Sequence, residues 1–339
     1  MRIERTTEAG EIWDPNKELW SGIEMLGGPV NAHSHLDRAG TITRSSFPMI
    51  NARLQEKWSI VDEIKTQSSV EDIFDRMAST VERLRVEGTK VIGSFIDVDP
   101  VVGDKAMRAA DKLRETYKGE ITFVFANQTL KGVCTPEARA WFDYGAAWAD
   151  IVGGLPGKDS PHEEEHIEIV LQTATDMGKM AHVHVDQLNT TCERETELLA
   201  RKTIEAGMQS RVVAIHAISL ATHEHAYREY VYALMQKAGM MAISCPNAWI
   251  NSRRTEQMAV THNAVTPVDE MHRWGIPVAI GSDNIFDVYM PYNGGFMRDE
   301  VHTLLEATHM YDPDYLALVT TLNGRVVLGL IPDISSYQT

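Results

Sequence analysis

The sequence predicts an α/β protein folded as a (β/α)8 TIM barrel. Eight short, β-branched apolar runs alternate with segments whose apolar residues recur at intervals of three and four. This alternation, repeated eight times, is typical of such barrels, and 339 residues suffice for one barrel of about 250 residues with additions. The expected strands are 29–35, 90–97, 121–127, 149–155, 180–185, 211–216, 240–245 and 277–282.

The segments between these runs read as helices. Clear examples are 103–117, 161–178, 193–207 and 223–239. The stretch 40–89 carries two helical patterns and is expected to cover part of the barrel mouth. No linker or repeat divides the chain. We therefore expect one domain over 1–339, with an N-terminal extension (1–27) before the barrel (28–330).

Composition narrows the class of protein. A hydrophobic content of 43% with 24% charged residues is typical of a soluble globular protein. The formal net charge of −16 argues against a nucleic-acid partner, because phosphate binding needs clustered Lys and Arg. No apolar run approaches the length of a membrane span, and the first residues, MRIERTTEAG, lack a signal-peptide core. We expect a cytoplasmic protein without a membrane partner, and three scattered cysteines that form neither disulfides nor a zinc site.

Histidines and an aspartate end several expected strands. The first strand carries His33 and His35, the fifth ends at His184, the sixth at His216, and Asp283 follows the eighth. Side chains at the carboxyl ends of barrel strands converge on the mouth, where such barrels carry out catalysis. Three imidazoles and a carboxylate suit zinc or a similar divalent ion that keeps a position open for water. A paired histidine motif alone also occurs by chance.

The order of these residues resembles the amidohydrolase superfamily. The similarity is closest to its cytosine deaminase-like branch, which includes the aminohydrolases of s-triazine breakdown. It extends from about residue 25 to 330 and includes HSHLDR, FVFANQ, VGGLPG, TPVDEMHRWGIPVAIGSDNIFD and LNGRVVLGL.

The resemblance implies a role for each matching residue. His33, His35, His184 and Asp283 would bind one divalent ion, most simply zinc, with iron or manganese as alternatives. Asp283 would also act as the base, and His216 would orient the water and polarise the substrate. The substrate contacts that we expect, some by resemblance and some by position on the functional face, are Gln128, Asn284, Phe286, Tyr289, Trp249 and Arg253.

Three departures from the family pattern affect the prediction. Deaminases of this branch carry a glutamate that moves protons to the substrate, and here Gln187 stands at that position; a neutral amide is no general acid at pH 7. Asp186 could replace it or could instead fix a histidine. Relatives also usually add a small β-sandwich, for which little sequence remains, so an interface in a homo-oligomer would be one way to cover its place. Many relatives with two metal ions carry a carboxylated lysine at the end of the fourth strand, where it bridges the ions. Here Lys158 lies beyond that strand and its turn, so the resemblance implies one metal ion.

The string HEEEH from His162 matches the zincin motif H-E-x-x-H. Because it follows Pro161 at the start of an amphipathic helix, we interpret its glutamates as solvated residues that favour the helix N-terminus.

The function predicted from the sequence is metal-dependent hydrolysis of a C–N bond in a small nitrogen heterocycle, cyclic amide or amide. The alternatives are deamination of an aminoheterocycle with Asp186 in place of the missing glutamate, lactone hydrolysis, and a non-catalytic metal-binding barrel.

Overall fold

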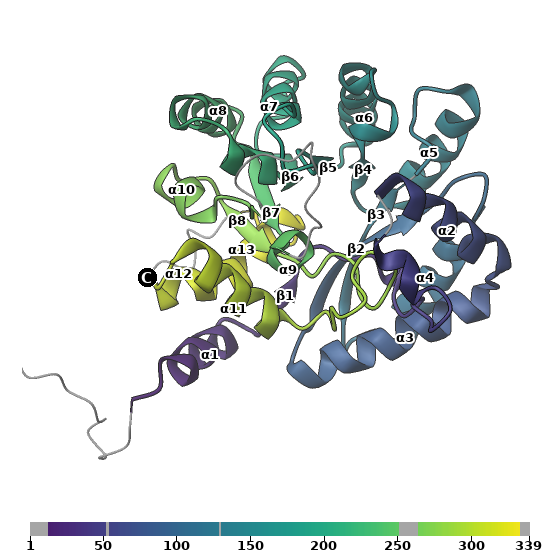
Figure 1. The fold of residues 1–339 in the computed structure, drawn as a ribbon, viewed down its shortest axis with the longest axis horizontal. Helices are drawn as coiled ribbons and strands as arrows, with labels where there is room; N and C mark the ends of the chain where they lie inside the picture. The colour runs from purple at the N-terminus through teal and green to yellow at the C-terminus, as the bar shows by residue number, and fades with distance from the viewer. Residues whose placement is uncertain (1–12, 52–53, 129, 251–263, 333–339) are drawn as a thin grey trace, which may run out of the picture.

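The computed structural model describes residues 13–51, 54–128, 130–250 and 264–332. Eight strands with helices between them make up its centre (Figure 1). All eight match expected strands, although several are shorter than the apolar run that predicted them. They are β1 (Val30–Asn31), β2 (Val91–Asp97), β3 (Thr122–Gln128), β4 (Val152–Gly154), β5 (Ala181–Val185), β6 (Val212–His216), β7 (Met241–Ser244) and β8 (Val278–Ile280).

The strands pair in parallel and in sequence order. Hydrogen bonding groups them into a sheet of β1-β2-β3 and a sheet of β4-β5-β6-β7-β8. Two isolated parallel bridges join the sheets: Ala126 pairs with Ile151 between β3 and β4, and Ser34 pairs with Asp283 beyond β1 and β8. The Ala32 N–H also donates to a carbonyl of β8 at 3.0 Å. The architecture is thus the predicted (β/α)8 barrel.

Glycines allow the close approach of strands at both junctions between the sheets. A Cβ on Gly281, after β8, would lie 2.6 Å from the backbone nitrogen and oxygen of His33. A Cβ on Gly153 of β4 would overlap the carbonyl oxygen of Asn127 in β3. Any larger side chain at these two positions would push the neighbouring strand away, so the junctions depend on glycine.

Most helices surround the strands on the outside, while α9 lies over the middle of the strands in this view (Figure 1). The α-helices are α1 (Pro15–Met25), α2 (Leu54–Gln67), α3 (Val70–Glu87), α4 (Lys105–Thr116), α5 (Pro136–Trp148), α6 (Glu163–Met177), α7 (Glu195–Glu205), α8 (His225–Lys237), α9 (Pro246–Ile250), α10 (Val268–Arg273), α11 (Met297–Thr308), α12 (Pro313–Thr320) and α13 (Leu322–Val327). Short 3-10 turns are η1 (Leu36–Arg38), η2 (Phe47–Asn51), η3 (Pro156–Lys158) and η4 (Ile218–Thr222).

The core has an inner and an outer layer that follow the two faces of each strand. In β6, Val213 and Ile215 belong to an apolar cluster that joins six of the strands and α13 and so fills the barrel. Val212 and Ala214 belong to the layer between the strands and the helices. Alternation of side chains along a strand produces this division.

The described part of the N-terminal extension, from residue 13, forms helix α1. Its buried Leu19, Trp20 and Ile23 share an apolar cluster with Tyr315 and Leu316 of α12. The two helical patterns expected in 40–89 are α2 and α3. Every strand within the described ranges belongs to the barrel, so those ranges contain no accessory sandwich.

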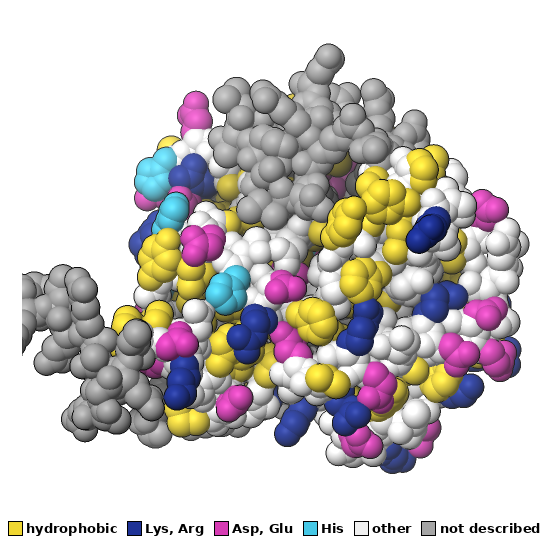
Figure 2. Space-filling model, turned by 60° about the horizontal axis from the view of Figure 1, so that its bottom comes forward, with side chains coloured by type: hydrophobic (Ala, Val, Ile, Leu, Met, Phe, Trp, Pro, Cys, Tyr) yellow, Lys and Arg dark blue, Asp and Glu magenta, His cyan; other side chains and the backbone are white. Residues whose placement is uncertain are grey.

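The surface in Figure 2 shows basic and acidic side chains interspersed with apolar ones. Among the described helices, none is both long enough and apolar enough to cross a bilayer.

Candidate metal centre

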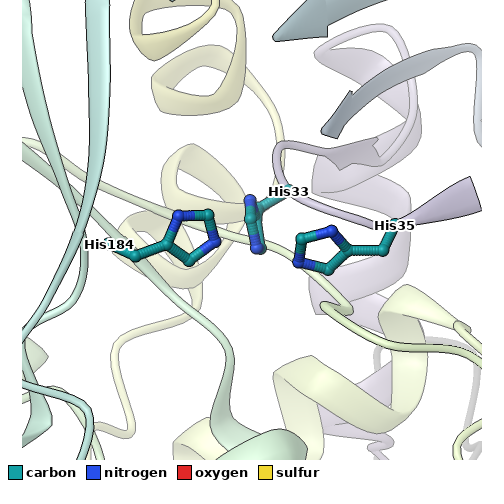
Figure 3. Close-up of side chains that lie close together, drawn as sticks. All are labelled: His33, His35 and His184. Carbon is teal, nitrogen blue, oxygen red and sulfur yellow. The ribbon is translucent and has the colours of Figure 1, made fainter. Parts of the chain in front are cut away.

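Four imidazole rings meet at the carboxyl ends of the strands. The ring of His33 lies 5.0 Å from that of His35, 4.9 Å from that of His184 and 5.5 Å from that of His216, measured between centroids. Figure 3 shows the first three rings turned toward one another, two from the β1 end and one from β5. All four side chains are buried. Residues far apart in the sequence therefore form one compact group of nitrogen ligands.

Asp283 completes this group from the β8 side. Its Oδ1 lies 3.2 Å from Nε2 of His35 and 3.5 Å from Nε2 of His33, and its Oδ2 lies 4.0 Å from Nε2 of His216. Ligand atoms of His33, His35 and His184 lie within 4.8 Å of one another, as do those of His33, His216 and Asp283. The two sets share His33, so the carboxylate and the imidazoles surround a common region.

The protonation states of the cluster suit a metal ion. Burial, together with the nearby Arg38 charge, lowers the pKa of His35 to about 3, and burial lowers the pKa of His216 to about 3. Burial also holds the pKa of His184 well below its usual value. For Asp283, burial alone would raise the pKa, but the His33 and His35 rings outweigh it and keep that pKa well below its usual range. Neutral imidazoles and an ionised carboxylate are the forms that bind divalent ions.

Unpaired ring nitrogens give a second test of this fit. Nε2 of His33 and Nε2 of His184 are buried without a hydrogen-bond partner in the described ranges. Buried polar atoms are rarely left unsatisfied in folded proteins. A divalent ion with this donor set would use such nitrogens, so the residues present fit the predicted metal.

His184 is oriented by a second layer of hydrogen bonds. Its Nδ1 lies 3.1 Å from the Gly154 carbonyl oxygen at the end of β4. The next residue, Leu155, donates its N–H to Nε2 of His166 at 2.9 Å, and Nδ1 of His166 lies 2.6 Å from Asp159. A donor at Nδ1 leaves Nε2 of His184 for the metal. His166, the second histidine of HEEEH, thus stabilises the turn after β4 through its hydrogen bonds. This fits the interpretation of HEEEH as structural.

His216 reaches the cluster because the strand pattern breaks. Regular alternation would place it with Ala214 on the outer face of β6. Its backbone is instead left-handed, with φ 75°, and its ring lies 5.4 Å from that of His184. A non-glycine residue in this conformation is strained and is often found at functional sites.

Asp186 has other partners. Its Oδ1 accepts the N–H of Glu195 at 2.8 Å and its Oδ2 accepts the N–H of Thr196 at 3.3 Å, both in the first turn of α7. In return, its own N–H donates to Oε2 of Glu195 at 3.0 Å. Both carboxylate oxygens thus serve the helix N-terminus. Gln187, next in the chain, is half-buried.

The six expected substrate contacts lie in different parts of the structure. Gln128 ends β3 with its Oε1 buried and unpaired among the described residues, and Asn284 is buried beside Asp283. The Tyr289 ring lies 5.8 Å from the Arg38 guanidinium. Phe286 lies elsewhere: its ring is 4.6 Å from the guanidinium of Arg83 in α3, in the layer outside the barrel.

The last two of these residues follow β7. Trp249 belongs to helix α9, while Arg253 lies outside the described residues.

A buried charge network beside the histidines was missed from the sequence. Nη1 of Arg38 donates to both oxygens of Asp97 at 3.1 and 3.2 Å, and Nζ of Lys65 lies 2.9 Å from Asp97. All three side chains are buried. The signal was present in HSHLDR, where an aspartate and an arginine follow the paired histidines within a run that folds inward.

Comparison with known proteins agrees with this geometry. Residues 143–322, more than half of the chain, match the Amidohydrolase family. An uncharacterized protein of Haemophilus influenzae is 49% identical over 253 residues, which cover 74% of this chain and 92% of that protein. N-isopropylammelide isopropyl amidohydrolase of Pseudomonas sp. is 25% identical, over 80% of this chain and 65% of its own length.

A solved structure is similar over most of the chain. The 5-methylcytosine deaminase of Klebsiella pneumoniae superposes with a TM-score of 0.79 at 25% identity, covering 89% of this chain and 75% of the deaminase. The predicted superfamily and barrel are thereby confirmed. This chain belongs to the amidohydrolase family, as a hydrolase of the deaminase-like branch that acts on C–N bonds.

Proposed function

We propose that the chain hydrolyses a C–N bond at an sp2 carbon of a small nitrogen heterocycle or cyclic amide. In this proposal His33, His35, His184 and Asp283 hold one divalent ion, with zinc preferred and iron or manganese as alternatives. The observation that carries it is the set of buried imidazoles whose ligand atoms lie close to one another and to the ionised Asp283. A divalent ion bound there would lower the pKa of a bound water so that hydroxide is available near neutral pH.

Two residues of this chain then handle protons and the substrate. Asp283 takes the proton of the attacking water at Oδ2, the oxygen that faces His216. His216 is neutral because burial lowers its pKa to about 3, so it acts by hydrogen bonding to the water or to the substrate. Burial of the cluster keeps bulk water away, which strengthens these interactions.

The substrate's edge would be recognised beside this cluster. Gln128 presents an unpaired amide oxygen, within the described residues, and Gln187 is a second neutral amide near His184 in sequence. Tyr289 offers an aromatic wall next to Arg38. Asn284, Trp249 and Arg253 remain proposed contacts, whereas Phe286, whose ring packs against Arg83, is no longer proposed as one. Small polar heterocycles match such a mixture of amide and aromatic groups.

Opening of a cyclic amide is the version that we favour. Deamination requires an acid that protonates a ring nitrogen and the leaving amine. Gln187 is neutral, and both oxygens of Asp186 accept N–H groups of α7. Hydrolysis of a carbonyl already polarised by the ion needs one proton transfer fewer, and Asp283 can return the proton that it has taken.

Deamination is the second candidate, because two similar proteins are named for the removal of an amine or amino substituent: the isopropyl amidohydrolase and the 5-methylcytosine deaminase. With such a substrate, the proton for the leaving amine would have to come from Asp283 or His216.

The test begins with metal analysis of the purified chain, which should contain one divalent ion per chain. A panel of pyrimidines, triazines and lactams is then followed in parallel for ammonia release and for ring opening. Ring opening without ammonia supports the favoured version, and ammonia release supports the second. A chain that holds no divalent ion would contradict both.

A further inference from the structure

Arg38 connects the buried charge network to the metal centre. While its Nη1 is held by Asp97, its Nη2 donates to Oδ1 of Asn284 at 3.4 Å. Arg38 is 6% exposed, and Asp97 is fully buried. Lys65 also pairs with Asp97. Asp97 bonds to the guanidinium of Arg38 through Nη1. The other side of the guanidinium is therefore directed at Asn284.

Asn284 contacts both Arg38 and Asp283. Its Nδ2 donates to Oδ1 of Asp283 at 3.1 Å. An amide can turn its oxygen and nitrogen either way round, and a neighbouring donor decides which way it turns. Because Arg38 donates to the oxygen, the nitrogen must face Asp283.

The two oxygens of Asp283 thereby differ. Oδ1 receives the Asn284 hydrogen bond and lies beside the His33 and His35 rings, whereas Oδ2 faces His216. An oxygen that already accepts a hydrogen bond is the weaker base. The carboxylate is thus held with one oxygen toward His33 and His35 and the other toward His216.

We propose that Arg38 and Asn284 are positioning residues that fix the carboxylate of Asp283 in its metal-binding orientation. Arg38 acts through Asn284, and Asp97 holds Arg38. The inference rests on the metal site of the proposed function and adds two residues that set its affinity. Hydrogen-bond partners of metal ligands commonly contribute about 10- to 100-fold to metal affinity.

The test measures zinc affinity by competition with a chromophoric chelator, on wild-type chain and variants stripped of metal. Asn284→Ala and Arg38→Met should each bind zinc about 10-fold or more weakly than wild type. The double variant should bind no more weakly than Asn284→Ala alone, because Arg38 has no route to Asp283 without the amide. Losses that multiply in the double variant would overturn the relay.

Two further variants separate positioning from folding. Arg38→Lys keeps a cation for Asp97 but lacks the fork that reaches Asn284, so it should fold and yet bind zinc as weakly as Arg38→Met. Arg76→Gln is the matched control, since Arg76 lines the same cavity as Arg38 and its Nη2 donates to the backbone of Asp37 at 3.3 Å. It should bind zinc as wild type does.

The outcomes distinguish this inference from the proposed function. If wild type binds zinc tightly and Arg38→Lys and Asn284→Ala do so equally, the inference is wrong and the metal site stands. Equal weakening by Arg76→Gln would show a general disturbance of the cavity and would also overturn it. If wild type binds no divalent ion, the proposed function itself fails.

Discussion

Asp186 and Asp283 are a natural pair for comparison. Each directly follows or closely follows a strand, each is buried, and each has a left-handed backbone, with φ 55° and 57°. Their partners nevertheless differ completely. Asp283 faces three imidazoles, while the oxygens of Asp186 accept N–H groups from the first turn of α7. The same residue type in the same local conformation thus faces the histidine cluster in one place and a helix N-terminus in the other.

The difference follows from the next element in the chain. After Asp186 the loop returns quickly to α7, whose unsatisfied N–H groups attract a carboxylate. After Asp283 a longer loop precedes α11, and the backbone of Asp283 pairs with the segment of His33 and His35. The element that follows each aspartate therefore decides whether its carboxylate faces the imidazoles or a helix N-terminus.

Asp283→Ala should show the largest effect. It removes a metal ligand and the base together, so we expect loss of the bound ion and a fall in kcat/KM of about 10³-fold or more. Metal content and turnover are measured on the same preparation. Asp186→Ala is the matched control and should retain its metal; a variant at position 283 that keeps full activity would show that the base lies elsewhere.

His216→Asn tests the proposed role of the ring that faces Oδ2 of Asp283. Loss of the ring should lower kcat by about 10²-fold, because a group that orients water or substrate is removed. The metal content should stay at the wild-type level. If the ion is lost as well, His216 is a ligand and the two oxygens of Asp283 are not distinguished as described.

Gln187→Ala examines the residue next to Asp186. A side chain that only binds the substrate should raise KM about tenfold and leave kcat within about threefold. Steady-state kinetics on the substrate that the panel identifies give both constants. A collapse of kcat at unchanged KM would instead place Gln187 in the chemical step.

Asp186→Ala should act on stability. Removal of the carboxylate leaves N–H groups of α7 without their acceptor, which costs about 1 kcal/mol in the free energy of unfolding. Asp186→Asn, which keeps one acceptor oxygen, should cost less. Denaturant unfolding measures both. A large loss of kcat with unchanged stability would restore Asp186 as the general acid.

Glu193→Gln should change only the pH dependence of the stability. Burial, with the neighbouring Asp186 charge, raises the pKa of Glu193 to about 7. Its neutral form therefore stabilises the fold fully below the usual pKa of about 4.5, and this stabilisation is lost as the pH rises through 7. We expect the variant to flatten the decline in stability between pH 5 and 8 by about 1 kcal/mol, because partial exposure screens the charge. An unchanged slope in thermal unfolding would contradict this.

The strand pattern could be predicted well from the sequence, and its exceptions could not. Seven of the eight strands lie within the expected runs and β3 ends one residue beyond its run, at Gln128, since periodicity reports burial directly. The first was expected over 29–35, but the regular strand is Val30–Asn31. Beyond it the backbone bonds to the Asp283 segment through isolated contacts, which periodicity cannot show.

The candidate site shows the same limit. The convergence of the histidines and Asp283 was predictable because their place at the carboxyl ends of strands is set by the fold. The roles of Arg38, Asp159 and His166 were not, because each depends on a partner brought near by folding. The left-handed backbone that turns His216 inward likewise leaves no mark in the residue pattern.

The junction between β1 and β8 has a consequence for how the chain folds. There the Asn31 side chain donates to Ser282 Oγ, 251 residues away in the sequence, and the Asp283 N–H donates to the His33 carbonyl at 3.0 Å. Contacts between residues so far apart in the sequence form slowly, because the chain loses conformational entropy before the contacts stabilise it. During synthesis, His33 and His35 can meet Asp283 only after the eighth strand has been made. A divalent ion bound by residues of both strands would stabilise the closed barrel. The yield of folded protein should therefore rise with the supply of metal.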